Sequence, residues 1–392
     1  MNFKFSQATS FIRPSAVRDV LSWTKNKDMI SLSGGYPAPE TFPAMLYGKL
    51  YDQAVSEFGL RIHQYGTTEA FDPFREEEAK HLKNKGVKIS NLENINVMSG
   101  SQQALDILGR IFIDPGDTIV VTDPTYLGAL QAWGPYQPRY LTIPVDEEGP
   151  IPEKLDQGLK NQPAKFVYLV PTFDNPRGVT ISARRREAIA KIIQKHHTVL
   201  IEDDPYSELR YEGKSEIPIQ ARIPKQTVYL NTFSKILFPS SRLGVIVAPD
   251  EISLMFIKIK QGVDLFTSTL SQAIAAIYLR DGHLNQHLPQ IVKVYQPRRE
   301  AMLEALKNYF FSGFGWTKPE GGMFVWVEGP KGLDTSKTLY KALDQNVSYV
   351  PGPSFYADLN QGKNCFRLNF SNQPPEKIKL GVKILGRLFQ SA

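Results

Sequence analysis

The sequence predicts an α/β fold in which a largely parallel sheet is covered by helices on both faces. Short runs in the middle of the chain are apolar at successive positions, which is typical of strands buried on both faces. Helix-length amphipathic stretches such as Ala183–Lys195 lie between several of them, and this alternation favours parallel strands. The expected strands are Ile95–Met98, Thr118–Thr122, Phe166–Val170, Val199–Glu202, Val228–Asn231 and Gly244–Ala248.

A second, smaller α+β unit is expected toward the C-terminus. After Pro249 a long helical region extends to about Lys307, and Pro289 and Pro297 should break or kink it. The elements expected beyond it are a strand at Met323–Glu328, a helix at Ser336–Gln345, strands near Val347–Val350 and Phe366–Phe370, and a helix from about Pro375. We therefore expect an N-terminal arm with part of the small domain at 1–44, a large domain at 45–285 and a small domain at 286–392.

Composition narrows the class of protein. The chain of 392 residues is long enough for one large and one small core, and its 42% apolar and 22% charged residues are those of an ordinary globular protein. The net charge of +6 is scattered, so no nucleic-acid face is expected. The single cysteine, Cys365, favours a reducing cytoplasm, and no apolar run is long enough for a membrane span. Leu284 stands where a zinc motif between His283 and His287 needs glutamate, so no metal is expected.

Polar residues follow the successive strands, where open α/β sheets bind their ligands. The small residues 99–102 open a helix, which suits a phosphate group. Each motif also has an ordinary explanation, because Asp-Pro and Asn-Pro form turns and a lysine after a strand is usually solvated. Their succession favours a site. The later strand ends contribute Tyr126, Asn175, Asp203 with Tyr206, and Lys235 with Thr232, Ser234 and Arg242.

Several of these motifs resemble the class I/II aminotransferases, which are fold-type I pyridoxal-phosphate (PLP) enzymes. The most specific are TFSKILFPSSRLG (232–244), EDDPYSELRY (202–211), SGSQQALD (99–106) and NPRG (175–178). Further motifs resemble the 2-aminoadipate and kynurenine aminotransferases: SAVRD (15–19), SLSGGYPAPETFP (31–43), QYGTTEAFDPFRE (64–76) and GGMFVWVE (321–328). The resemblance runs from Ser15 to about Phe370. It implies a large domain with a mostly parallel seven-stranded sheet flanked by helices, plus a smaller α+β domain.

The resemblance implies a role in cofactor chemistry for each matched residue. Lys235 would hold PLP as a covalent aldimine and, once freed, act as the base and acid of the proton shift. Asp203 would pair with the pyridine nitrogen, Tyr206 and Asn175 would donate to the phenolic oxygen, and Tyr126 would stack on the ring. The phosphate would be held by Gly100, Ser101, Gln102, Thr232, Ser234 and Arg242.

The resemblance also implies the substrates and a partner. Arg367, with Asn175, would bind the α-carboxylate of amino-acid and 2-oxo-acid substrates such as 2-oxoglutarate. Arg18, on a mobile N-terminal helix, would read the side-chain carboxylate of 2-aminoadipate or glutamate, and Gly35 would line that pocket. Aromatic or aliphatic substrates also fit such a helix. Tyr65 would reach the phosphate of a neighbouring subunit, which implies a homodimer with shared active sites.

The chain departs from the family pattern in places, and two alternatives stay open. Asp174 and Arg177 replace the usual glutamine and threonine around Asn-Pro, Thr232 replaces a serine, and Ser240-Ser241 replaces Gly-Leu. Arg177 would alter the rim of the pocket. One alternative is other PLP chemistry, a β-lyase or decarboxylase, since fold does not settle reaction. The other is a ligand-sensing domain of a transcription regulator, for which too little chain precedes the matched region.

Overall fold

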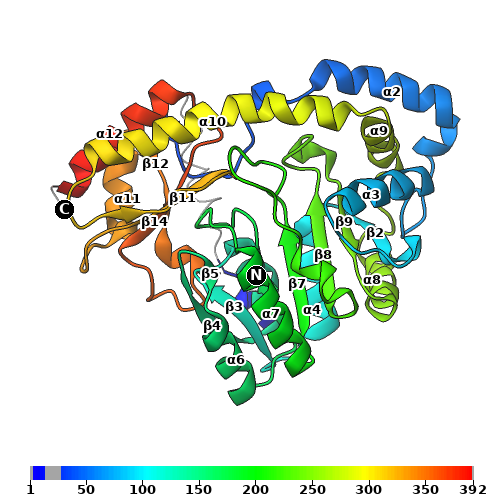
Figure 1. The fold of residues 1–392 in the computed structure, drawn as a ribbon, viewed down its shortest axis with the longest axis horizontal. Coiled ribbons are helices and arrows are strands. Elements are labelled where there is room, and N and C mark those ends of the chain that lie inside the picture. Colours follow the sequence, from blue (N-terminus) through cyan, green and yellow to red (C-terminus); the bar gives the residue numbers. More distant parts are fainter. Residues whose placement is uncertain (1–2, 14–27, 391–392) are drawn as a thin grey trace.

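The computed structural model describes residues 3–13 and 28–390. These form a large domain built on one sheet and a smaller domain beside it, with a long helix along both (Figure 1). Arg18 and the SAVRD motif lie outside the described residues. Within the described ranges no helix combines the length and apolar character needed to cross a membrane.

The large sheet confirms the expected architecture. Its order is β2-β9-β8-β7-β6-β3-β4-β5, and every neighbouring pair from β8 to β4 is parallel. Seven strands are joined by an eighth, two-residue strand, β5, which is antiparallel to its neighbour, as β9 is to β2 and β8. The strands are β2 (Ile95–Met98), β3 (Thr118–Asp123), β4 (Arg139–Asp146), β5 (Gly149–Pro150), β6 (Phe166–Leu169), β7 (Val199–Asp204), β8 (Thr227–Thr232) and β9 (Gly244–Val247).

Strand β4 has no counterpart among the strands expected from the sequence. Most of its residues are partly or fully exposed, and Ile143 is the buried one. A strand of this kind has no continuous apolar run, so a search for such runs misses it. It pairs with β3 in parallel toward the edge of the sheet.

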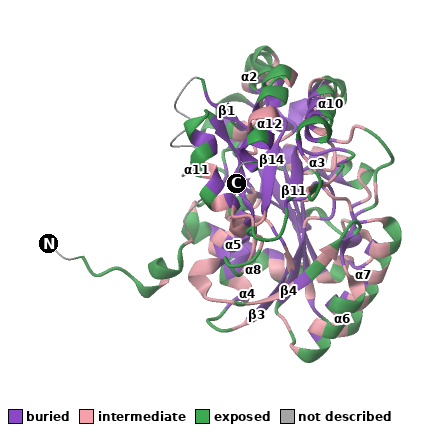
Figure 2. Cartoon of the chain, turned by 90° about the vertical axis from the view of Figure 1, so that its left-hand side faces the viewer, coloured by how far each residue is buried: buried purple, intermediate pink, exposed green. Residues whose placement is uncertain are grey.

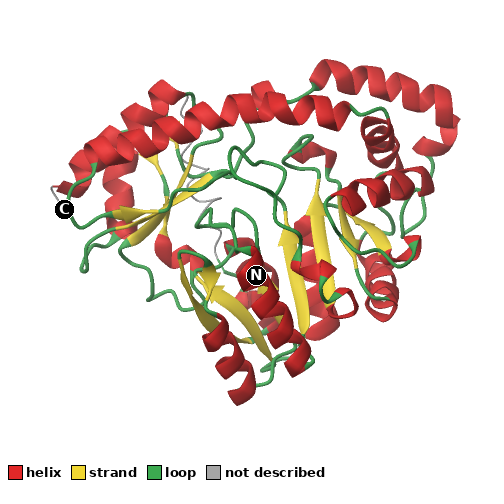
Figure 3. Cartoon of the chain, in the orientation of Figure 1, coloured by secondary structure: helices red, strands yellow, loops and turns green. Residues whose placement is uncertain are grey.

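Helices cover both faces of the sheet, as Figure 3 shows. In β8, Val228 and Leu230 pack among residues of α4, α5 and α8, while Tyr229 between them packs among those of α2, α3 and α9. This alternation explains why the strand is apolar at three successive positions, 228–230. The helices are α2 (Ala44–Phe58), α3 (Asp72–Asn84), α4 (Ser101–Phe112), α5 (Leu127–Trp133), α6 (Pro152–Asn161), α7 (Ala183–His196), α8 (Asp250–Val263) and α9 (Thr269–Arg280).

The small domain has an antiparallel sheet of order β10-β11-β14-β13, with α11 (Thr335–Asp344) and α12 (Pro375–Gln390). A two-stranded parallel sheet joins β1 (Ile30–Ser31) to β12 (Val347–Ser348), so this part of the N-terminal region pairs with the small domain. The four sheet strands are β10 (Gly315–Trp316), β11 (Phe324–Glu328), β13 (Val350–Pro351) and β14 (Cys365–Asn369).

Residues 3–13 lie elsewhere than the arm predicted from the sequence. Their 3-10 helix η1 (Gln7–Phe11) packs against η5 (Gly134–Tyr136) of the large domain, and the segment before it projects from the body (Figure 2). Arg13 reaches the small domain, where its Nη1 donates to the carbonyl of Tyr356 at 2.9 Å.

The long helix α10 (His283–Tyr309) is continuous where the sequence predicted a break or a kink. It packs against both α9 and α12 and runs through Pro289 and Pro297 without a break. A proline deprives the carbonyl four residues earlier of its partner. Here Asn285 and Lys293 carry those carbonyls, and both residues and both prolines are exposed, so water can replace the lost bonds. The predicted domain limits stay a prediction, and α10 crosses the one at 285/286.

Candidate active site

The parallel strands bring their carboxyl ends to one edge of the sheet. Tyr126 follows β3, Asn175 follows β6, Asp203 is the last but one residue of β7, and Lys235 follows β8. Parallel pairing places these ends together, so residues far apart in the sequence meet at the point where such sheets bind ligands.

Lys235 lies in the turn after β8, and its Nζ donates to the carbonyl of Gly35 at 3.0 Å. Burial, together with the nearby cations of Arg367 and Arg242, lowers the pKa of Lys235 to about 8. A substantial fraction of the amine is therefore uncharged near neutral pH, which is the form that acts as a nucleophile and base.

Uptake of PLP by the cofactor-free chain should depend on this ionisation. Because the pKa of Lys235 is about 8, the free-amine fraction, and with it the rate, should rise about tenfold per pH unit below pH 8 and level off above it. Stopped-flow absorbance after mixing with PLP across this range measures the rate. A rate that kept rising tenfold per pH unit up to about pH 10 would contradict the lowered pKa.

Asp203 is buried at the end of β7, and only one of its two carboxylate oxygens accepts a hydrogen bond from the described residues. Its Oδ2 accepts a hydrogen bond from the hydroxyl of Tyr168 at 2.8 Å, while Oδ1 has no hydrogen-bond partner among the described residues. Burial raises the pKa of Asp203 to about 7, the Tyr168 hydrogen bond opposes this, and the neighbouring Asp204 adds to it. A cationic N–H facing Oδ1 would keep this carboxylate ionised.

Arg367 comes from β14 of the small domain and joins the two domains at the site. Its Nη1 donates to Oδ1 of Asn175 at 2.7 Å and its Nη2 to the carbonyl of Ser33. The guanidinium lies 4.3 Å from the ring centre of Phe324 and 5.0 Å from that of Phe355. Burial lowers the pKa of Arg367 to about 10, so the group is still a cation at neutral pH.

Tyr206 also belongs to this cluster. It is buried, and burial raises the pKa of its phenol, while a side-chain hydrogen bond with Asn175 and the charge of Arg367 lower it. A phenol held neutral in this way can donate a hydrogen bond to an oxygen in the site.

The phosphate end of the predicted site is formed by the start of α4. Gly100 caps this helix at φ 84°, and Arg242 Nη2 donates to the carbonyl of Ser99 at 2.7 Å. A side chain at Gly100 would come within 2.5 Å of the same nitrogen, so only glycine leaves the guanidinium uncovered here. The hydroxyl of Ser101 is buried with no hydrogen-bond partner among the described residues, which suits an anion at the helix N-terminus.

The other residues predicted at the phosphate differ in what they contact. Thr232 and Ser234 lie together, with their hydroxyl oxygens 3.1 Å apart. The side chain of Gln102 instead donates to the carbonyl of Gly128 at 2.9 Å and so ties α4 to α5. Tyr126 caps α5, and Gly128 leaves room for its ring, since a side chain there would come within 2.5 Å of it.

The remaining predicted site residues are Tyr65, Gly35 and Arg18. Tyr65 is 76% exposed, and its ring packs 5.5 Å from that of Phe266. Gly35 takes part through its carbonyl, and a side chain there would come within 2.9 Å of the Phe324 ring. Arg18 lies outside the described residues.

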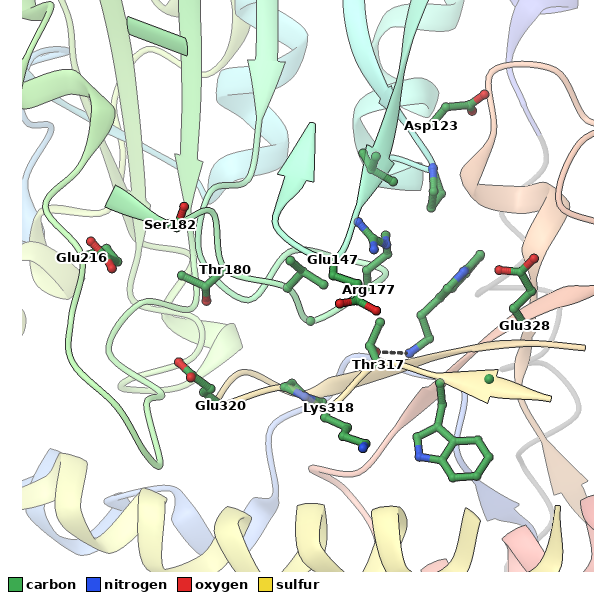
Figure 4. Close-up of a pocket in the computed structure, with 18 of the residues that line it drawn as sticks. Asp123, Glu147, Arg177, Thr180, Ser182, Glu216, Thr317, Lys318, Glu320 and Glu328 are labelled. Atoms are coloured by element: carbon green, nitrogen blue, oxygen red, sulfur yellow. Dashed lines mark hydrogen bonds between the residues drawn. The ribbon is translucent and has the colours of Figure 1, made fainter. Parts of the chain in front are cut away.

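Arg177 lies in the wall of a cleft of about 870 Å³ between the two domains (Figure 4). The large domain contributes Asp123 and Glu147 to this cleft, and the small domain contributes Thr317. Arg177 Nη2 donates to the carbonyl of Asp146 at 2.7 Å. Arg177 also lines a smaller cavity that reaches Tyr126 and Asn175, so it lies between the cleft and the site.

Tyr168, Ser33, Phe324 and Phe355 take part in the site and were not expected from the sequence. For Tyr168 a signal existed, because a tyrosine in an otherwise apolar buried strand needs a hydrogen-bond partner. The carbonyl of Ser33 and the two phenylalanine rings carry no such signal. Ser33, Phe324 and Phe355 take part because the fold places them against Arg367.

The residues at this site fit PLP. Asp203 Oδ1 is a buried acceptor for a ring N–H, and Ser101 with the bare start of α4 suits a phosphate. Lys235 supplies an amine of lowered pKa for the aldehyde.

Comparisons with known proteins agree with this chemistry. The family model "Aminotransferase class I and II" matches residues 29–385. Aromatic-amino-acid aminotransferase 1 of Thermococcus litoralis is 44% identical over 97% of this chain and 93% of its own length.

Two solved structures are also similar over nearly the whole chain. Kynurenine aminotransferase of Pyrococcus horikoshii, in complex with PMP, has a TM-score of 0.95 and 43% identity, covering 99% of this chain and 97% of that one. The α-aminoadipate aminotransferase of Thermus thermophilus, complexed with N-(5′-phosphopyridoxyl)-L-leucine, has a TM-score of 0.90 and 35% identity, with the same coverage of 99% and 97%. The chain belongs to the class I and II aminotransferases, and it is a PLP-dependent enzyme that acts on amino acids.

Proposed function

We propose that the enzyme moves the amino group of an L-amino acid to a 2-oxo acid such as 2-oxoglutarate at the site formed by Lys235, Asp203, Asn175 and Arg367. One observation carries the proposal. Lys235 and Arg367 donate to the carbonyls of Gly35 and Ser33, which are two residues apart. The amine and the guanidinium therefore face the same small space, one able to move a proton and the other able to hold a carboxylate.

Each side chain has a defined task in this proposal. Bound PLP supplies an electron sink for the electron pair of the substrate's Cα–H bond. Arg367 holds the substrate α-carboxylate and so fixes which Cα bond lies near the Lys235 amine. Lys235 takes the proton from Cα and returns it at the other end of the reacting system. Asp203 keeps the ring nitrogen protonated, and Tyr206 with Asn175 donates to the phenolic oxygen.

Product analysis tests the reaction. An L-amino acid and 2-oxoglutarate, mixed with the PLP-loaded enzyme, should give glutamate and the matching 2-oxo acid in equal amounts. Mass spectrometry with a ¹⁵N-labelled donor follows the nitrogen. Ammonia or carbon dioxide released without glutamate would instead indicate a β-lyase or decarboxylase, and the proposal would fail.

The substrate range stays a prediction. The relatives are named for aromatic amino acids, kynurenine and α-aminoadipate, which supports a broad range that includes acidic side chains. In a half-reaction screen, absorbance records which amino acids convert bound PLP to its amine form.

Arg18→Ala should lose activity mainly on glutamate and 2-aminoadipate. Equal losses on aromatic substrates would exclude Arg18 as the residue that binds the substrate's side-chain carboxylate.

A cytoplasmic location, which the single cysteine favours, is also proposed.

A homodimer with shared sites is the proposed assembly. Tyr65 is 76% exposed although the family motif QYGTTEAFDPFRE places it at a phosphate, which supports a role in the neighbouring subunit's site. Lys235→Ala and Tyr65→Ala chains should each be weak alone. Refolded together they should recover about a quarter of the wild-type rate, since half of randomly paired dimers are hybrids with one intact site.

The matched control for this test is Tyr340→Ala, which changes another exposed tyrosine, 60% accessible, on the small domain. Mixed with Lys235→Ala, it should give only the activity of its own wild-type sites. Recovery that did not exceed the sum of the separate chains, or sedimentation of the active enzyme as a monomer, would exclude shared sites.

A further inference from the structure

The hydrogen-bond partner of Asp203 within the protein is Tyr168. Tyr168 lies on β6, paired with Ile201 of the neighbouring parallel strand β7. Asp203 is two residues beyond Ile201, and residues two apart on a strand point to the same face. The strand register therefore brings the Tyr168 hydroxyl to Asp203 Oδ2, at 2.8 Å, with both residues buried.

This hydrogen bond determines how the carboxylate is turned. With Oδ2 taken by Tyr168, the second oxygen is the one left to meet a ligand, and Oδ1 has no partner among the described residues. A carboxylate on a freely rotating bond would present either oxygen at varying angles. The hydrogen bond from Tyr168 fixes the carboxylate in one orientation, in which Oδ1 can accept a linear hydrogen bond from a ring N–H.

Tyr168 is itself held rigidly by the part of the structure that carries the phosphate site. The Trp133 ring packs edge-on against it, with centroids 5.1 Å apart and an interplanar angle of 83°. Trp133 Nε1 donates to the carbonyl of Leu105 in α4 at 2.8 Å. Helix α4 begins at Ser101. Tyr168 thus connects the helix at the predicted phosphate end to the carboxylate at the predicted ring end.

The hydrogen bond also has an electrostatic consequence. Burial raises the pKa of Asp203, the charge of Asp204 raises it further, and Tyr168 lowers it. Without the phenol, Asp203 would compete more strongly for the proton it shares with a ring nitrogen. The ring would then carry less positive charge.

We propose that Tyr168 is a positioning residue for the cofactor: its hydroxyl orients Asp203 so that Oδ1 meets the ring nitrogen, and its hydrogen bond keeps the carboxylate ionised there. This inference rests on the proposed role of Asp203. The adjacent carboxylate offers a matched comparison, because Asp204 points to the opposite face of the sheet and accepts from Tyr229 in the same way. Tyr229 is as fully buried as Tyr168.

The test compares Tyr168→Phe with Tyr229→Phe, since each removes one buried hydroxyl from one carboxylate. The cofactor-free full chain is titrated with pyridoxamine 5′-phosphate, which binds without a covalent bond. Tyr168→Phe should bind it roughly tenfold more weakly, the factor expected for one lost hydrogen bond to a charged group, and Tyr229→Phe should stay near wild type. Equal weakening in both variants, or none in Tyr168→Phe, would overturn the proposal.

A spectroscopic measurement separates orientation and charge from general packing. In PLP-loaded Tyr168→Phe, the pH at which the visible absorption band changes should move upward, because a less positive ring withdraws less electron density from the linkage to Lys235. Tyr168→3-fluorotyrosine, a stronger donor of nearly the same shape, should move it downward and serves if the phenylalanine variant does not fold. Shifts of the same sign in both variants would refute the electrostatic role.

Asp203→Asn distinguishes failure of this inference from failure of the proposed function. If Asp203→Asn leaves binding of pyridoxamine 5′-phosphate unchanged, the role of Asp203 itself is wrong. If it weakens binding while Tyr168→Phe does not, only the present inference fails. In a double-mutant cycle, Tyr168→Phe should have no further effect on binding in the Asp203→Asn background, whereas additive losses would show that Tyr168 acts independently of Asp203.

Discussion

Lys235→Ala should abolish both turnover and the covalent attachment of PLP. The variant removes the amine that bonds to the cofactor and the group that moves the proton at Cα. The loss of the proton transfer alone corresponds to roughly 10²–10⁴-fold in rate. Single-turnover kinetics with a preloaded cofactor measure the chemical step, and mass spectrometry after borohydride reduction shows whether PLP is attached to the chain.

Lys225→Ala is the matched control for this prediction. Lys225 precedes β8, in η7 (Pro224–Gln226), and is exposed, whereas Lys235 follows the same strand at its other end. Its loss should leave rate and attachment unchanged. A Lys235→Ala variant that transaminated at close to the wild-type rate would refute the mechanism.

Arg367→Lys should lower kcat/KM by about a hundredfold for amino acids and for 2-oxo acids alike. Lysine keeps the charge but loses the planar fork that binds a carboxylate through two parallel hydrogen bonds. A hydrogen bond to a charged group contributes about 1.5–3 kcal/mol, which sets the expected scale. Initial rates with several donors and acceptors provide the measurement, and most of the loss should appear in KM.

The Arg367 prediction depends on what all the substrates share. Because every substrate carries an α-carboxylate, the loss should be similar across side chains. Arg184→Lys makes the same change on the exposed surface of α7 and should leave kcat/KM as it is. A loss confined to acidic donors would mean that Arg367 reads the side chain instead.

The strands whose ends carry the site residues were predictable because burial on both faces gives them apolar residues at successive positions. Strand β8 is apolar on both faces because helices cover both, and Lys235 follows directly at its end. Strand β4 has no such apolar run, because most of its residues are partly or fully exposed to solvent. The same limit explains α10, where the sequence shows two prolines but not that Asn285 and Lys293, which carry the affected carbonyls, are exposed.

Contacts between strands were harder to foresee. The bond between Tyr168 and Asp203 depends on the register of β6 against β7, which no local pattern records. The carbonyls of Ser33 and Gly35 come from a segment about 200 and more residues away from Lys235 in the chain, and their position follows from the pairing of β1 with β12. Motifs identified the chemical groups, while the fold determined which groups support them.

The carbonyl of Ser33 also bears on how the enzyme discriminates among ligands. Arg367 is already hydrogen-bonded to two neutral acceptors, this carbonyl and Oδ1 of Asn175, before any substrate arrives. A ligand must therefore offer something better than a peptide carbonyl, and a carboxylate does so because it brings a full negative charge. A simple amine without that group would only trade one neutral partner for another. The resting enzyme is in this way preorganised for amino acids, with the cost of ordering Arg367 already met during folding.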